Sequence, residues 1–293
     1  MQTYSNYVDA HVVACGSVKE IRVRQAPILG KLHADRKNAE VREYLFRGWL
    51  VQSAMEALPV STDPGLAISA KLWAPVQAYY AVHGVGMAVL QALGAAEPDS
   101  HTKFCSSMAT HVVPRGLPTP LNATVTGGVD HFVYGGVSVD SKLVDTLSVL
   151  ATVSPANAEL FVAKALKTTR EKNLKERYKK EAKKRRSRGT TRRNLPAEEK
   201  ASIAFALHPT TIFDLLYRMR LRSNYDDPDM FIYGQADRWS AKRRYENVLK
   251  LTQCITACLE VIVERKIGSS SFGELKSEFS KRIPGRTEAS SST

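Results

Sequence analysis

The sequence predicts a mainly α-helical bundle with a small β-hairpin and a basic helical insertion. Apolar residues recur at helical spacing over three long stretches, residues 41–58, 66–93 and 236–266. Between residues 121 and 140 the pattern changes to short strands bounded by glycines. Almost all of the net charge of +13 lies in residues 164–193, where fifteen Lys and Arg face three acids, a balance of +12 that leaves +1 for the rest of the chain.

The first 113 residues are expected to hold an N-terminal extension and the first half of the bundle. Residues 1–40 show weak periodicity, which indicates a short helix with loops and no assignable role. Residues 41–113 should supply three helices, over 41–58, 66–93 and 101–113, ended by Pro59, Gly94 and Pro114. The apolar stripe expected for the second of these helices is Trp73, Val76, Tyr80, Met87 and Leu90. Gly84 should let a neighbouring helix approach closely.

Residues 114–206 are predicted to be an insertion that holds the hairpin and the basic arm. Two strands flank Gly127-Gly128, and such a hairpin must pack on something because it is marginally stable alone. Ser154 and Pro155 should then start a helix whose apolar face ends near residue 166. Beyond that point we expect a projecting basic helix and a flexible tract from Lys183 to Arg193. A short helix over 197–207 should follow.

Residues 207–266 are expected to complete the bundle. Thr211 and Asp214 approximate a capping box, with Pro209 in the first turn of the helix that they start. One long helix should cover residues 236–266. The Ser- and Lys-rich residues 267–293 are expected to be a disordered tail.

The helix that starts at Thr211 carries an arginine at every second position, Arg218, Arg220 and Arg222. Arg218, Arg222 and Tyr225 lie at i, i+4 and i+7, so they should share one face. Three cations on one helix repel one another unless an anion, a carboxylate or water receives them. Phosphate suits such a face, since a guanidinium group binds it in bidentate fashion. The alternatives are exposure to solvent or ion pairs with the nearby acids Asp226, Asp227 and Asp229.

Several stretches resemble the HEPN superfamily of helical-bundle proteins (higher eukaryotes and prokaryotes nucleotide-binding). Residues 73–83, 88–94 and 100–101 are similar to its second and third helices, residues 218–227 to its motif helix, and residues 236–266 to its last helix. The resemblance covers residues 41–113 and 207–266, about half of the chain.

The resemblance implies a metal-independent endoribonuclease whose motif is an Arg, four to six residues, and a His. Arg218 matches the arginine, but Ser223 stands at the histidine position, and serine cannot serve as the base near neutral pH. His83 or His101 is a candidate replacement that the bundle fold can bring near the arginines. In the mechanism that the resemblance implies, Arg218 acts with Arg222 or Arg220 to neutralise the scissile phosphate. Asn224 or Tyr225 then orients the attacking ribose hydroxyl.

The basic arm is a candidate nucleic-acid interface, because a polyanion relieves its self-repulsion and phosphate binding releases counterions. The residues expected to contact nucleic acid are Lys175, Arg177, Lys179, Lys180, Lys183, Lys184, Arg185, Arg186, Arg188, Arg192 and Arg193. A solvated face, a nuclear-type address signal or a contact with an acidic protein are the alternatives.

Two functions therefore remain open. The first is an RNA-binding HEPN-like protein that acts as an endoribonuclease of the toxin or phage-defence kind, as a homodimer. The second is a non-catalytic module that docks a nuclease, nucleotidyltransferase or ATPase partner. Neither requires a metal or cofactor, and the chain contains no phosphate loop or dinucleotide fingerprint. The sequence shows no apolar run long enough to cross a membrane, so a cytoplasmic location is expected.

Overall fold

The computed structural model describes residues 2–31, 39–59, 63–148, 151–187, 195–226 and 238–282. It is mainly helical, and the described residues form one two-stranded antiparallel sheet. The elements up to the sheet are α1 (Gln2–Cys15), α2 (Val18–Gln25), η1 (Ile28–Lys31), α3 (Ala39–Ala57), α4 (Pro64–Ala92), α5 (His101–Ser107), η2 (Met108–Val112) and α6 (Val113–Gly116). The sheet and the elements after it are β1 (Thr124–Gly128), β2 (His131–Gly135), α7 (Ser141–Thr146), α8 (Ala158–Ser187), α9 (Ala197–Ala206), α10 (Ile212–Leu221), η3 (Arg222–Asp226), α12 (Arg238–Ile267) and α13 (Ser269–Arg282).

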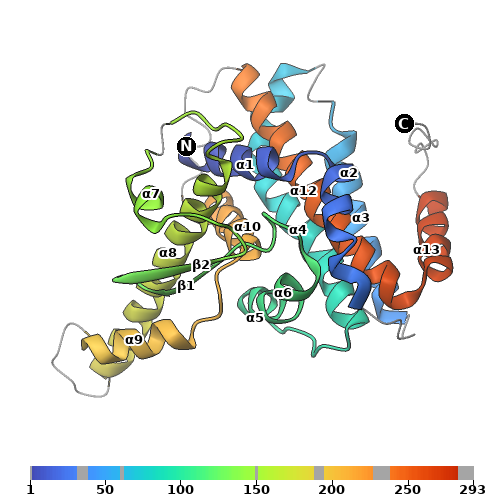
Figure 1. Cartoon of the computed structure of the whole chain (residues 1–293). Coiled ribbons are helices and arrows are strands. Elements are labelled where there is room, and N and C mark those ends of the chain that lie inside the picture. The colour runs from blue at the N-terminus through green and yellow to red at the C-terminus, as the bar shows by residue number, and fades with distance from the viewer. Residues whose placement is uncertain are drawn as a thin grey trace.

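Helices α3, α4 and α12 form the central bundle (Figure 1). The expected close approach at Gly84 is confirmed, because a Cβ atom there would lie 2.6 Å from the backbone nitrogen of Gly48 on α3. The predicted apolar stripe of α12 is also buried. On α4, however, two residues expected in the core are partly exposed, Trp73 at 59% and Tyr80 at 39%.

The N-terminal segment belongs to the core and is more than an extension. Helix α1 packs against α8 and α12, and α2 packs against α12. The buried Gln25 side chain donates hydrogen bonds from Nε2 to the carbonyl oxygens of Gly116 (2.7 Å) and Cys258 (2.8 Å). These contacts join the start of the chain to α6 and α12.

The hairpin is confirmed, but its turn is displaced from the expected position. Gly127 and Gly128 end β1 and pair with β2, so the turn falls at residues 129–130. Val125 of β1 exchanges two backbone hydrogen bonds of 2.9 Å with Thr210, just before α10. The hairpin therefore supports the start of α10, in addition to packing against α8 and α9.

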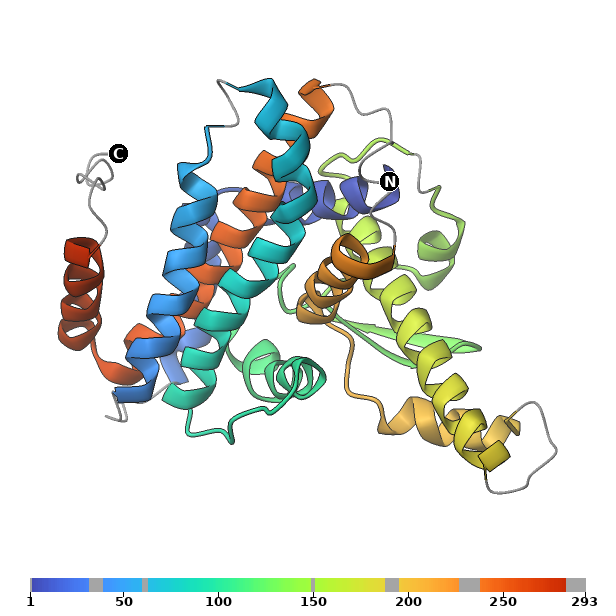
Figure 2. The same ribbon diagram turned by 180° about the vertical axis from the view of Figure 1, so that it is seen from behind.

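Helix α8 is only partly a projecting arm. It begins at Ala158, three residues after the expected start, and its buried face extends beyond residue 166 to include Thr169, Arg170 and Leu174. The first half packs against α1 and α10, and the far end projects together with α9 (Figure 2). Helical structure continues to Ser187, which corrects the expected flexible tract for residues 183–187; residues 188–193 of that tract lie outside the described residues.

The expected disordered tail is wrong for residues 269–282, which form α13. Its Phe272 and Phe279 are buried, and both rings lie against Trp49 of α3, at centroid distances of 5.9 and 5.2 Å. The composition of this segment is polar overall, but two aromatic residues seven positions apart fall on one helical face and provide the anchor. Residues 283–293 lie outside the described residues.

Candidate functional site

Helix α10 holds the candidate site in a fixed position. The predicted capping box is confirmed, since the Asp214 carboxylate accepts the Thr211 N–H at 2.9 Å. Pro209 precedes the N-cap, so it does not lie in the first turn. After Leu221 the helix widens into the π-helical turn η3, a feature often found at functional sites.

The three arginines of this helix do not share one environment. Arg220 faces α4 and α5, whereas Arg218 faces α1 and α8 and Arg222 faces α1. Both Arg218 and Arg222 place their guanidinium groups over the Tyr4 ring, at 5.3 and 4.8 Å. Residues two apart on a helix point in nearly opposite directions, which explains the separation. Of the two partners expected for Arg218 at a phosphate, Arg222 lies on the same face, over the same tyrosine ring, and Arg220 does not.

Arg220 lies at the centre of an aromatic cluster and is only 8% exposed. Its Nη2 donates a hydrogen bond of 2.8 Å to the Tyr80 hydroxyl. The guanidinium carbon lies 5.0 Å from the centroid of the Tyr80 ring, 5.5 Å from that of Tyr79 and 5.8 Å from that of Tyr217. These cation–π contacts keep a charged group favourable in a largely buried place. The Nε atom of Arg220 finds no hydrogen-bond partner among the described residues.

Two histidines complete this cluster. The ring centroids of His83 on α4 and His101 on α5 lie 5.3 Å apart, and His101 Nδ1 lies 2.8 Å from the hydroxyl of Tyr79. His101 also contacts Tyr217 of α10, at 5.4 Å between centroids. We call these residues the Arg220 cluster: Tyr79, Tyr80, His83, His101, Tyr217 and Arg220.

The environment keeps both histidines neutral at physiological pH. Burial, and then the neighbouring charges of His101 and Arg220, lower the pKa of His83 to about 4. Burial and the positive charge of Arg220 lower the pKa of His101 as well. Burial raises the pKa of Tyr79, so its phenol stays protonated. A neutral imidazole held by a phenol can accept a proton, which is the first requirement of a general base.

The sequence predicts only part of the Arg220 cluster. His83 and His101 were the candidate replacements for the missing motif histidine, and both lie beside Arg220. Tyr79, Tyr80 and Tyr217 were not predicted to be neighbours of the arginine. The signal available was the Tyr79-Tyr80 pair one turn before His83, which places an aromatic and an imidazole ring on one face of the helix.

The remaining predicted site residues lie elsewhere or are not described. Nη1 of Arg218 donates to the hydroxyls of Thr168 (3.3 Å) and Thr169 (3.2 Å) on α8. Asn224 is half-buried in η3, and the buried Ser223 hydroxyl finds no partner among the described residues. The side chain of Tyr225 lies outside the described part of the chain, as do the carboxylates of Asp226, Asp227 and Asp229.

Part of the basic set predicted to contact nucleic acid is exposed on the outer half of α8. The exposed basic side chains there are Lys175, Arg177, Lys179, Lys180, Lys183 and Lys184. Two of the predicted residues are engaged within the protein: Lys184 pairs with Glu181 at 3.1 Å, and Arg185 pairs with Glu199 of α9. The side chains of Arg186, Arg188, Arg192 and Arg193 lie outside the described residues.

Arg170 belongs to the same basic run but has a structural role. It is fully buried, and its guanidinium donates to the carbonyl oxygens of Gly127 (3.0 Å), Ala204 (2.7 Å) and His208 (2.6 Å). It thus ties α8 to β1 and to the segment between α9 and α10. Charge counting alone could not separate this residue from its exposed neighbours.

Within the described ranges, no three His, Cys, Asp or Glu side chains meet in a group that could hold a metal ion. The helices searched over those ranges include none with the length and apolar character that a bilayer crossing demands. Comparison with protein-family models, with curated proteins and with solved structures finds no match to this chain.

Proposed function

We propose that this chain is an RNA-binding protein of HEPN type that cleaves RNA without a metal ion, with Arg220 and His101 at the scissile phosphate. The observation that carries the proposal is the meeting of an arginine, a neutral histidine and two tyrosine hydroxyls from three different helices. The basic face of α8 supports RNA as the polyanion that this site would act on.

The chemistry needs a base and a group that stabilises negative charge. In the tautomer in which His101 Nδ1–H donates to the Tyr79 oxygen, the Nε2 lone pair is free to take the proton of a ribose 2′-hydroxyl. The 2′-oxygen then bonds to phosphorus while the bond from phosphorus to the 5′-oxygen breaks, and the leaving oxygen takes a proton from water. Arg220 and the Tyr80 hydroxyl would stabilise the charge that develops on the phosphoryl oxygens.

The RNA-cleavage assay is run in EDTA with the full chain and its His101→Asn and Arg220→Lys variants. We expect each change to lower the cleavage rate by about 100-fold or more, since positioned proton transfer and charge stabilisation each contribute on that order. Arg222→Lys is the matched control, because it makes the same substitution on the other face of this helical segment and should cut at nearly the rate of the unchanged protein.

The proposed mechanism predicts how the RNA-cleavage rate changes with pH. A base works in its deprotonated form, and the pKa of His101 is lowered. The cleavage rate should therefore rise with pH in the acidic range and reach its plateau at a pH below about 6.5, the ordinary pKa of histidine. Cleavage that survives His101→Asn unchanged, or that requires a metal ion, would remove this mechanism.

A non-catalytic module is the second candidate, and one observation favours it. Arg220 is almost fully buried and already engaged by three tyrosine rings, as expected of a structural residue. If the protein binds RNA through α8 but cuts none, the non-catalytic function is supported and the Arg220 cluster has a structural role only.

The resemblance to the HEPN superfamily implies that two copies pair with their α10 regions facing each other. Trp73 and Tyr80 lie seven residues apart on one face of α4 and are partly exposed, so they present an aromatic surface that includes the outer edge of the Arg220 cluster. This surface supports the proposal of a homodimer, and light scattering on the purified protein tests it.

A further inference from the structure

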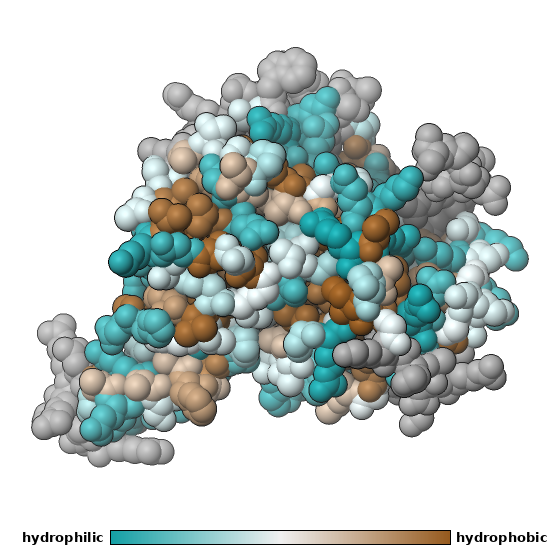
Figure 3. All heavy atoms as spheres, viewed as in Figure 1, coloured by the Kyte–Doolittle hydropathy of each residue, from teal (hydrophilic) through white to brown (hydrophobic). Residues whose placement is uncertain are grey.

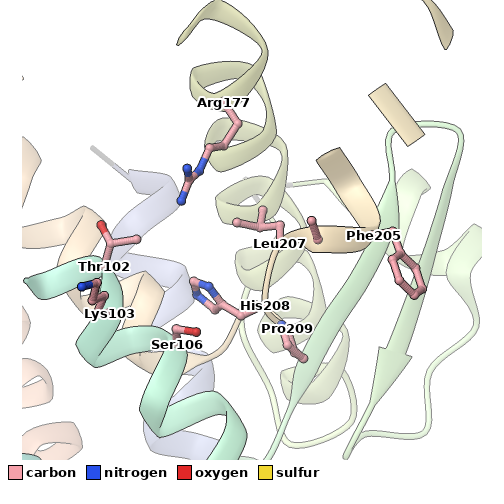
Figure 4. A pocket seen from close by; sticks show the side chains of 9 residues that line it. Thr102, Lys103, Ser106, Arg177, Phe205, Leu207, His208 and Pro209 are labelled. Carbon is pink, nitrogen blue, oxygen red and sulfur yellow. The ribbon is translucent and has the colours of Figure 1, made fainter. Parts of the chain in front are cut away.

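A pocket lies between α5, α8, the end of α9 and the segment that joins α9 to α10. Its volume is about 340 Å³, and it is lined by Thr102, Lys103, Ser106, Arg177, Phe205, Ala206, Leu207, His208 and Pro209. Pockets that hold small molecules range from about 300 to 1,000 Å³. Figure 4 shows Arg177 reaching from α8 into the space between the α5 side chains and His208.

The two sides of this pocket differ in chemistry. One side carries two cationic groups, from Lys103 and Arg177, and the hydroxyls of Thr102 and Ser106. The other side is mostly apolar and includes Leu207 and Pro209. The nine lining residues include no Asp or Glu. A ligand with a negative group at one end and a flat apolar group at the other fits this arrangement.

Arg177 is the cation best placed to receive the negative group. Lys103 is held by an ion pair of 2.6 Å with Asp99, so part of its charge is already balanced. Arg177 is exposed and makes no ion pair with any other described residue. A guanidinium group binds phosphate through two parallel hydrogen bonds, which makes phosphate the natural anion here.

The apolar side of the pocket is fixed before any ligand binds. Arg170 holds the carbonyl oxygens of Ala204 and His208 from behind, as described above. The His208 ring is held by a 2.9 Å contact between Nε2 and the buried Asp214 carboxylate, which leaves Nδ1 as the nitrogen that can meet a ligand. A preformed wall lowers the entropic cost of binding.

The pocket adjoins the Arg220 cluster through α5. His101 lies in the cluster, and the next residue, Thr102, lines the pocket. Consecutive Cα atoms are about 3.8 Å apart, so the cluster and the pocket adjoin the same turn of α5. The exposed basic residues of α8 continue outward from Arg177. Figure 3 shows that the projecting lobe carries hydrophilic residues together with weakly apolar ones.

We propose that this pocket is a subsite for one unpaired nucleotide of the RNA. Arg177 and the α5 hydroxyls bind its phosphate, and Leu207 and Pro209 receive its base. The inference rests on the proposed function, because it assumes that the strand cut at the Arg220 cluster runs along α5 to α8. The shared chemistry of the ligand is a nucleoside phosphate, whether free or within a strand.

The experiment titrates the full chain with uridine 5′-monophosphate by calorimetry or NMR, alongside uridine and inorganic phosphate. We expect saturable binding of the nucleotide and weaker binding of either fragment. Arg177→Gln should weaken nucleotide binding by about ten-fold or more, because a charge-assisted contact is lost. Arg115→Gln is the matched control, since it makes the same substitution at an exposed position of α6 that does not line the pocket, and it should bind the nucleotide like the unchanged protein.

A single-stranded uridine oligonucleotide distinguishes the two sources of the ligand. Its displacement of the bound mononucleotide supports a subsite for RNA, whereas no displacement overturns that assignment. Equal weakening by Arg177→Gln and Arg115→Gln, or no saturable nucleotide binding, overturns the pocket itself. The proposed cleavage is measured separately with His101→Asn, so its failure leaves the nucleotide titration interpretable.

Discussion

At the scale of single residues, two arginines are kept inside the protein in different ways. Arg170 is surrounded by carbonyl oxygens, which satisfy its donors without a direct carboxylate partner. Arg220 is surrounded by tyrosine rings, and its Nε atom meets no acceptor among the described residues. A buried arginine with all donors used serves the fold, whereas one with an unused donor at a cluster of hydroxyls and imidazoles is suited to an anion.

A third buried polar residue predicts how stability depends on pH. His11 is fully buried in α1, its Nδ1 lies 2.6 Å from the Tyr7 carbonyl oxygen, and burial lowers its pKa to about 4. Below the ordinary pKa of about 6.5 the unfolded chain binds a proton that the native protein does not, so stability falls with decreasing pH until about pH 4. By about pH 5 this residue alone should have cost about 2 kcal/mol relative to neutral pH.

The test measures urea unfolding of His11→Leu and of the unchanged protein at about pH 7 and about pH 5. The variant should lose less stability on acidification, by about 2 kcal/mol, while His83 contributes the same to both proteins. An identical loss in the two proteins would show that His11 is not responsible.

At the scale of secondary-structure elements, α10 shows what a sequence pattern can and cannot predict. The capping box at Thr211 and Asp214 depends on neighbours in the chain, so it could be predicted from the sequence. The direction of each arginine could be predicted as far as Arg218 and Arg222 sharing a face. What each face meets depends on α1, α4, α5 and α8, which come from distant parts of the sequence and are brought together only by packing.

Helix α13 gives the clearest case of an element missed because its partners are distant. Its Phe279 ring lies 5.4 Å from Phe46 and 5.2 Å from Trp49, more than 200 residues earlier in the chain. Lys276 adds an ion pair of 3.1 Å with Glu260, which also accepts the Trp49 Nε1–H. Average composition predicts disorder here, because it does not weigh two aromatic residues on one face.

Phe279→Ala should therefore destabilise the protein by about 3 kcal/mol, since it removes a buried aromatic ring from this contact. Phe205→Ala on α9 makes the same chemical change at a ring that is 94% exposed, and it should alter stability by less than about 0.5 kcal/mol. Chemical denaturation of both variants measures the difference. Equal effects at the two positions would mean that α13 does not dock on α3 in solution.

At the scale of the whole molecule, α8 connects the N-terminal helix α1, the hairpin and α10. Its inner half packs against α1 and α10, its side chains hold the hairpin and the segment before α10, and its outer half carries the exposed charge. The charge balance of residues 164–193 located this segment from the sequence. It could not show which cations face inward, because burial of Lys167 or Arg170 depends on partners such as Asp145 and the carbonyls of other segments.

The division between inner and outer cations predicts the salt dependence of RNA binding. Each phosphate that a lysine neutralises on single-stranded RNA contributes about 0.7 to the slope of log affinity against log salt concentration. Replacing both Lys179 and Lys180 with Gln should lower the magnitude of this slope by about 1.4. The control replaces Lys164 and Lys167, which removes the same charge, but these ammonium groups are held by Val144 and Asp145 and should leave the slope nearly unchanged. Fluorescence anisotropy over a range of salt concentrations measures both slopes. If the two double variants shift the slope equally, the net charge of the molecule governs RNA binding, and the outer face of α8 is not a defined interface.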